Sequence, residues 1–186
     1  MDKTVSLGSV KGTITPPSSK SYAQRAIALS LLAEGRTVLR NIEFCKDTRS
    51  ALKCIEALGA KITFLDERTI AIEGGLNPTS NTLYVGESGL ATRLFTPIAS
   101  LCKSPINIQG EGTLLYRPMG MMIEPLRTLG VSVRDGGGFL PIEVQGPIHG
   151  GMVKVDGSIS SQFITGLLLA LPMAEEATTL FVDDAV

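Results

Sequence analysis

The chain has 186 residues, of which 44% are hydrophobic and 20 are glycine, and tryptophan is absent. This length allows one domain with a sizeable core, and the composition suits an α/β protein with many tight turns. The formal net charge is −1, which excludes a global basic field for nucleic acid, so any anion site must be built locally.

No membrane segment is predicted, and we expect a cytoplasmic protein. The first residues alternate like a strand and lack the pattern of a signal peptide. The longest apolar run, 163–174, is too short to cross a bilayer and contains Pro172. The three cysteines form no CxxC pair and are interpreted as buried thiols. The single histidine, His149, lies in a Gly/Pro-rich turn, so a histidine-based triad or zinc site is poorly supported.

In chain order, the first 85 residues predict two helices and several short strands. Pro16 and Pro17 hold the entry to the first helix extended, and Ser18 or Ser19 can cap it. Asp47 can cap the second helix, which Gly59 closes. The predicted strands are 5–15 (two short strands around Gly8 and Gly12), 37–42, 60–64, 69–73 and 82–85, and the predicted helices are 19–33 and 48–58.

The same order then recurs. Gly59 and Gly130 are 71 residues apart, as are Gly89 and Ser160, and a fixed period of this kind indicates a structural repeat. We expect a unit of about 70 residues with the order helix, strand, helix and three strands. The later predicted elements are helices opened by Ser88-Gly89, by Arg117-Pro118 (to Leu129-Gly130) and by Ser160, with strands at 106–108, 131–133, 140–144, 152–155 and 178–182.

Two full copies and the start of a third are therefore expected. The third copy reaches Val186 before its second helix. Its sheet face would then lack its usual cover, so we expect either a fragment or a partner segment over that face.

Positive charge gathers at the predicted helix starts. Lys20 and Arg25 lie in the first two turns of the first helix, where unpaired N–H groups already favour an anion. If the units pack around a pseudo-threefold axis, the helix starts near 19, 89 and 160 converge. Arg93, Arg117 and the donors of Ser160-Ser161-Gln162 would join them, which suits a ligand with phosphate and carboxylate groups. Capped helices with solvated charges are the alternative.

Four stretches carry a resemblance to the enolpyruvyl transferases, and within them to the 5-enolpyruvylshikimate-3-phosphate synthase family. They are PPSSKSYAQR (16–25), GESGLATR (86–93), GEGTLLYRPM (110–119) and DGSISSQF (156–163). Each is weak alone, but their order and spacing match the family across nearly the whole chain. The resemblance covers only the N-terminal half of a two-lobed enzyme.

The resemblance implies a fold, an organisation and a reaction. The fold would be an α/β, inside-out, barrel-like lobe of repeated βαβαββ-type units, with helices inside and sheets outside. Residues 1–15 would associate with an absent second lobe, and 16–186 would form the substrate-binding lobe. The reaction would transfer the enolpyruvyl group of phosphoenolpyruvate to the 5-hydroxyl of shikimate 3-phosphate and release phosphate. It needs no metal or organic cofactor.

The resemblance also implies residue roles. Shikimate 3-phosphate would be bound by Lys20, Ser21, Arg25, Ser160, Ser161 and Gln162. Phosphoenolpyruvate would contact Lys20, Gly89, Arg117 and Gln162, with Lys20 as the catalytic candidate and Arg93 in support. The carboxylates that transfer protons would come from the second lobe.

The chain departs from the family pattern at Glu87 and Leu90, where relatives usually have asparagine and threonine. These changes bear on substrate affinity and inhibitor response. Three alternatives stay open. One is the sister transferase acting on UDP-N-acetylglucosamine, disfavoured because 110–116 contains no cysteine. The others are an RNA-end-processing cyclase, disfavoured by the place of His149, and a non-catalytic anion-binding lobe.

Overall fold

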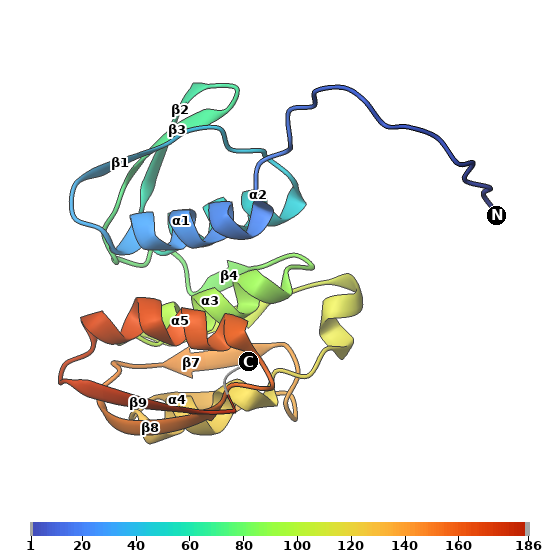
Figure 1. Cartoon of the computed structure of the whole chain (residues 1–186). Coiled ribbons are helices and arrows are strands. Elements are labelled where there is room, and N and C mark those ends of the chain that lie inside the picture. Colours follow the sequence, from blue (N-terminus) through green and yellow to red (C-terminus); the bar gives the residue numbers. More distant parts are fainter. Residues whose placement is uncertain (1, 185–186) are drawn as a thin grey trace.

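The computed structural model describes residues 2–184, which form a mixed α/β fold (Figure 1). The α-helices are α1 (Lys20–Leu32), α2 (Lys46–Ala57), α3 (Gly89–Ala99), α4 (Ile123–Thr128) and α5 (Ser161–Ala170). The 3-10 helices are η1 (Gly112–Tyr116), η2 (Gly120–Met122) and η3 (Leu171–Met173). The strands are β1 (Arg36–Leu39), β2 (Lys61–Asp66), β3 (Thr69–Glu73), β4 (Thr82–Tyr84), β5 (Ile106–Gln109), β6 (Ser132–Asp135), β7 (Ile142–Gln145), β8 (Gly151–Asp156) and β9 (Thr178–Asp183).

The strands form three sheets. The first has the order β1-β3-β2 and is antiparallel, the second has the order β4-β5-β7-β6, and the third pairs β8 with β9 in parallel. The sequence placed 82–85 with the first unit, and this was wrong, because β4 pairs with β5 in the second sheet. The physical reason is the connection. A strand that leads through a helix into the next strand forms a βαβ crossover, which lays the two strands side by side in parallel.

The helix α3 lies at the centre of the molecule and packs against both α5 and α1 (Figure 1). Every residue of α3 except Arg93 is buried, as expected for a helix that is covered on all sides. A Cβ atom added at Gly166 of α5 would lie 2.1 Å from the carbonyl oxygen of Arg93. Only glycine therefore lets the two helix backbones approach this closely.

Serine caps begin three of the helices, as the sequence predicts. The hydroxyl oxygens of Ser19, Ser88 and Ser160 accept hydrogen bonds from the backbone N–H groups of Tyr22 (3.4 Å), Ala91 (3.2 Å) and Phe163 (3.3 Å). Each cap satisfies one N–H group at the start of its helix.

Two predicted helix starts were wrong. The helix α2 begins at Lys46, and its N-cap is Cys45, which makes no side-chain cap hydrogen bond, so Asp47 lies inside the first turn. Arg117-Pro118 opens no helix. Arg117 is extended between η1 and η2, because a following proline disfavours the helical region, and α4 starts only at Ile123.

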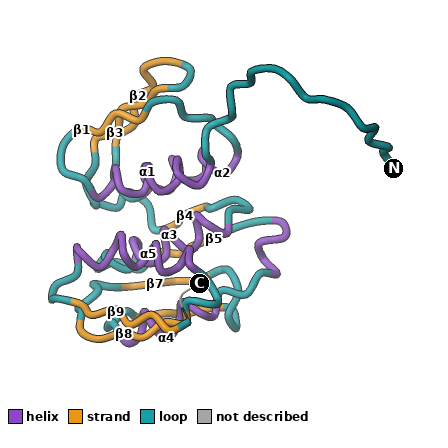
Figure 2. The backbone as a smooth tube through the Cα atoms, viewed as in Figure 1, coloured by secondary structure: helices purple, strands orange, loops and turns teal. Residues whose placement is uncertain are grey.

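The N-terminal segment forms no strand within the described residues. From Asp2 to Pro17 the chain is extended and exposed (Figure 2), so the two strands predicted over 5–15 are not formed. Val5, Leu7, Val10 and Ile14 are all at least 87% exposed. A strand requires a partner for its backbone N–H and C=O groups, and none lies beside this segment in the described chain. Met1, at the start of the predicted segment 1–15, and Ala185 and Val186, at the end of the predicted lobe 16–186, lie outside the described residues.

Candidate functional site

The first two turns of α1 present the residues that the first motif predicted. Ser19 caps the helix, and Lys20, Ser21 and Arg25 follow. The Lys20 Nζ atom lies 2.8 Å from Asp47 Oδ2 of α2. The hydrogen bond to Asp47, together with its negative charge, raises the pKa of Lys20. Arg25 Nη1 donates to the Ser21 carbonyl oxygen at 3.2 Å. Lys20 is thus charged and already has a carboxylate partner, which the sequence did not predict.

The first turn of α3 gathers two arginines around one glycine. Arg93 Nη1 donates to the Gly89 carbonyl oxygen at 3.1 Å. A Cβ atom added at Gly89 would lie 2.8 Å from Arg93 Nη1 and 3.5 Å from Arg117 Nη1. Arg117 therefore reaches the same point of α3 although it lies far along the chain.

Arg93 is the more buried of these two cations. Burial, and then the charge of Arg117, lower the pKa of Arg93, because a guanidinium loses hydration there and faces a like charge. The Arg93 Nε atom is buried and has no hydrogen-bond partner among the described residues. Two neighbouring cations, one of which has a buried Nε atom without a partner among the described residues, favour an anion beside the helix start.

The start of α5 completes this part of the site. Arg93 Nη1 also lies 3.4 Å from Gln162 Oε1, so α3 and α5 are joined by a side-chain hydrogen bond. A cavity of about 410 Å³ opens here, and it is lined by Arg93 and by residues 157–162. Its walls offer the guanidinium, three serine hydroxyls and the Gln162 amide, which can donate to a phosphate.

The two residues that depart from the family pattern point away from this cavity. Glu87 is exposed and its carboxylate lies over Gly112, where an added Cβ atom would be 2.6 Å from Glu87 Cδ. It lines a separate cleft of about 290 Å³ together with Asp47, Tyr84 and Glu111. Leu90 is 7% exposed and belongs to the core. The Glu87 charge is therefore directed toward η1 and away from residues 157–162.

The predicted site residues thus fall into two groups. Gly89, Arg93, Arg117 and Gln162 are brought together around the start of α3. Ser160 and Ser161 belong with them, because they line the same cavity as Arg93 and Gln162. Among the described residues, no hydrogen bond or ion pair joins Lys20, Ser21 or Arg25 to that group. The link between the two groups is indirect and runs through Gln24 of α1, whose Oε1 accepts a hydrogen bond from Ser88 Oγ at 2.9 Å.

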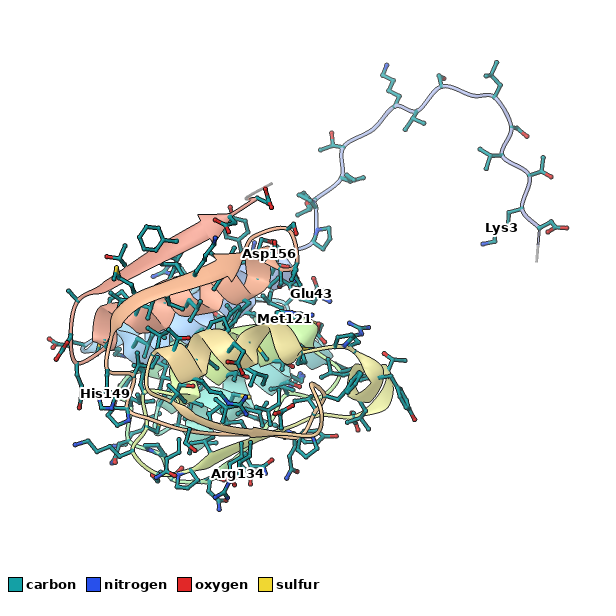
Figure 3. All side chains as sticks on the ribbon, turned by 90° about the horizontal axis from the view of Figure 1, so that it is seen from below. Lys3, Glu43, Met121, Arg134, His149 and Asp156 are labelled. Carbon is teal, nitrogen blue, oxygen red and sulfur yellow. The ribbon has the colours of Figure 1, made fainter. Side chains whose placement is uncertain are left out.

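The single histidine, His149, lies apart from the start of α5 in the described part of the chain. No three of its His, Cys, Asp or Glu side chains gather as a metal site. His149 Nδ1 lies 2.7 Å from Glu175 Oε2. Figure 3 shows His149 at one end of β8 and Asp156 at the other, so His149 is far from the loop that leads into α5. No helix among residues 2–184 has the length and apolarity to cross a membrane.

Of the three cysteines that were interpreted as buried thiols, Cys54 and Cys102 are buried, whereas Cys45 is only partly covered. Burial raises the pKa of Cys54 to about 12 and that of Cys102 to about 11.

Comparisons with known proteins agree with the motifs. The family model for EPSP synthase (3-phosphoshikimate 1-carboxyvinyltransferase) matches residues 6–186. The 3-phosphoshikimate 1-carboxyvinyltransferase of Methanothermobacter thermautotrophicus is 35% identical over 190 residues, covering 100% of this chain and 45% of the relative. That of Haemophilus influenzae is 37% identical over 187 residues, covering 94% of this chain and 43% of the relative.

A solved structure gives the same result for the fold. The EPSP synthase of Acinetobacter baumannii superposes with a TM-score of 0.83 at 27% identity, over 94% of this chain and 41% of that one. The chain therefore spans less than half the length of the relatives it matches. With the matched residues covering nearly all of it, the chain belongs to the EPSP synthase (3-phosphoshikimate 1-carboxyvinyltransferase) family.

Proposed function

We propose that this chain supplies one substrate-binding lobe of an enzyme that transfers the enolpyruvyl group of phosphoenolpyruvate to the 5-hydroxyl of shikimate 3-phosphate and releases phosphate. The product is a precursor of chorismate and the aromatic amino acids, and we place the reaction in the cytoplasm. The observation that carries the proposal is the contact of Arg93 with both Gly89 and Gln162 at the mouth of the 157–162 cavity.

The proposed architecture is a set of repeated units with helices inside and sheets outside, of which the third is partial. The order of α1, β1, α2, β2 and β3 is followed by a similar order from α3 to β7, which supports this view. Residues 1–15 are assigned to the sheet of a second lobe. Their exposed and alternating apolar side chains at Val5, Leu7, Val10 and Ile14 would be buried by such a partner.

Shikimate 3-phosphate is assigned to Lys20, Ser21 and Arg25 of α1 and to Ser160, Ser161 and Gln162 of α5. The start of α5 would hold the phosphoryl group, since hydroxyl and backbone N–H donors converge where the helix dipole is positive. Ser160 Oγ already accepts from Phe163 N–H, which leaves its own proton free to be donated to the ligand.

Phosphoenolpyruvate is assigned to Lys20, Gly89, Arg117 and Gln162. It carries a phosphate and a carboxylate, and Lys20 and Arg117 would neutralise them while Gly89 lets the ligand approach the backbone. Arg93 supports this group by holding Gln162 and the Gly89 carbonyl. Preorganised cations of this kind also stabilise charge that develops in the transition state.

The chain's own residues then orient the two substrates for addition of the 5-hydroxyl to C2 of phosphoenolpyruvate. The hydroxyl gives up its proton as C3 gains one, and the tetrahedral intermediate then loses phosphate from C2 and a proton from C3, which restores the double bond. We assign the proton-transfer carboxylates to the second lobe, so the 186-residue chain alone should bind without turnover. No cofactor is assigned to the reaction.

The test measures phosphate release from the two substrates by the isolated chain, and separately after a second lobe is added. We expect release only in the second case. Ordinary turnover by verified 186-residue material would contradict the assignment of the proton-transfer groups. In the two-lobe enzyme, Lys20→Ala should lower the affinity for both substrates, whereas Arg117→Ala should lower the affinity for phosphoenolpyruvate more than that for shikimate 3-phosphate.

A non-catalytic anion-binding lobe is the second candidate, favoured by the match to under half of each relative. It predicts ligand binding but no phosphate release even with a second lobe present. UDP-N-acetylglucosamine serves as the control ligand for the sister reaction, and we expect it not to bind.

A further inference from the structure

A buried amide lies in the contact between α1 and α3. Gln24 is fully buried, and it is one turn after Lys20 and directly before Arg25. Around it α1 is apolar, with Ile27 and Leu31 also fully buried. Gln24 therefore places a polar group beside the buried apolar side chains of α1, at the height of the proposed ligand-binding residues.

Its hydrogen bond reaches the cap of α3. Ser88 Oγ donates to Gln24 Oε1 at 2.9 Å and accepts from Ala91 N–H at 3.2 Å. Ser88 itself is 3% exposed and directly precedes Gly89. One hydrogen bond thus joins the turn that carries Lys20 to the turn that begins with Gly89.

This arrangement is not the most stable one available. The Gln24 Nε2 atom is buried and has no partner among the described residues, and a buried donor without a partner costs stability. An apolar side chain of similar size would avoid that cost. A hydrogen bond, however, is directional, and it can fix how two helices are placed against each other where apolar contacts allow sliding.

The second helix contact of the site is also fixed. Gly166 brings α5 against the Arg93 carbonyl of α3, and Arg93 reaches Gln162. If α3 holds α5 in place, then the position of α1 on α3 sets the separation between the α1 donors and the α5 donors. Both sets are assigned to shikimate 3-phosphate.

We propose that Gln24 is a positioning residue. Through Ser88 it holds the first turn of α1 in place on the start of α3, so that Lys20 and Arg25 meet the same ligand as Ser160. This inference rests on the proposed function, because the ligand is shikimate 3-phosphate.

The test uses the 186-residue chain with Gln24→Met, which keeps the size and removes the hydrogen bond. Calorimetric titration with shikimate 3-phosphate should show affinity about fivefold weaker, the usual effect of losing one buried hydrogen bond. The thermal midpoint should stay about unchanged, because the unpartnered Nε2 is removed while the buried Ser88 hydroxyl loses its acceptor. A residue with a purely structural role would instead lower the midpoint and leave the affinity of the folded protein unchanged.

Two further variants make the test independent of one substitution. Ser88→Gly removes the same hydrogen bond from the α3 side and keeps a residue that is tolerated at an N-cap, so it decides the matter if Gln24→Met does not fold. The double variant should bind no more weakly than the weaker single variant, because both remove one interaction. Ser30→Ala is the matched control. Ser30 is a buried polar residue of α1 whose Oγ donates only within its own helix, to Ala26 O at 2.7 Å.

The outcomes separate this inference from the proposed function. Normal binding by the unsubstituted chain and by both single variants would overturn the positioning role alone. A loss of affinity in Ser30→Ala as large as in Gln24→Met would overturn it too. If the folded unsubstituted chain does not bind shikimate 3-phosphate, the proposed function fails, and the positioning role fails with it.

Discussion

Replacing Gly166 by alanine tests the close contact between α3 and α5. The added Cβ atom would lie 2.1 Å from the Arg93 carbonyl oxygen and 3.2 Å from Leu94 Cα. A carbon atom normally stays about 3.3 Å or more from a carbonyl oxygen. Because the contacted atoms are backbone, no side chain can turn aside, and the two helices must separate.

The magnitude follows from two opposed effects. Alanine stabilises a helix interior by about 1 kcal/mol relative to glycine. Overpacking in a close-packed contact costs about 1–3 kcal/mol, and a backbone clash belongs at the upper end. We therefore expect a net loss of about 1–2 kcal/mol. For a protein of this length, that corresponds to a fall in thermal midpoint of about 2–8 °C.

The assay is thermal unfolding followed by circular dichroism, together with titration of shikimate 3-phosphate. Affinity should fall as well, because separating the helices breaks the 3.4 Å contact between Arg93 and Gln162. The control is Gly8→Ala, where an added Cβ atom meets nothing within 4 Å, and its midpoint should not change. A midpoint for Gly166→Ala equal to or above the unsubstituted value would refute the reasoning.

Three further predictions concern charge and ionisation. Asp47→Asn should raise the affinity for shikimate 3-phosphate about two- to fivefold in calorimetry, because Lys20 loses a partner that competes with the ligand. The gain is limited because such an ion pair is worth under about 1 kcal/mol. Weaker binding by this variant would contradict the prediction. In a two-lobe enzyme, Gly89→Ala should weaken the binding of phosphoenolpyruvate more than that of shikimate 3-phosphate, because the added Cβ atom displaces the cations of Arg93 and Arg117. Equal losses of affinity for the two ligands would count against the assignment. Above pH 9 the free energy of unfolding should fall by up to about 1.4 kcal/mol per pH unit for each of the buried thiols of Cys54 and Cys102, because the unfolded chain loses the Cys54 proton near its ordinary pKa of 9.0 while the folded protein keeps it to about 12. In Cys54→Ala, the free energy of unfolding measured with urea should fall less steeply as the pH rises above 9. An equally steep fall in both proteins would show that burial of this thiol is not the cause.

Local signals predicted the elements that begin with a cap. Ser19, Ser88 and Ser160 each precede a mainly apolar run, and each caps a helix in the structure. The start of a helix depends on its own neighbouring residues, so one stretch of sequence is sufficient to identify it. The hairpin of β2 and β3 was also predicted, because its two strands and its turn are neighbours in the sequence.

Long-range contacts could not be predicted in this way. The place of β4 in the second sheet depends on a partner 25 residues along the chain, with Thr82 opposite Asn107. The Lys20–Asp47 pair depends on how α2 packs against α1. A carboxylate in the first turn of α2 was visible in the sequence, but its direction was not. The hydrogen bond from Ser88 to Gln24 joins residues 64 apart and gives no sequence signal.

The convergence of Gly89 and Arg117 lies between these two cases. The motifs named both residues, and the spacing of the repeat suggested that the helix starts meet. The structure brings Arg117 to Gly89 from an extended segment instead of from a helix start. The residue was thus predicted through the family resemblance, while its local structure was not.

The most direct test of the central claim is chemical-shift mapping of the isotope-labelled 186-residue chain with shikimate 3-phosphate at low and high ionic strength. Charge-assisted hydrogen bonds to phosphate should move the backbone amide signals near Lys20 and near Ser160 in the same titration. Added salt should weaken the binding, because the site is open to solvent. If saturating ligand leaves both sets of amides unshifted while the remaining spectrum shows a folded protein, these residues do not bind shikimate 3-phosphate and the central claim is wrong.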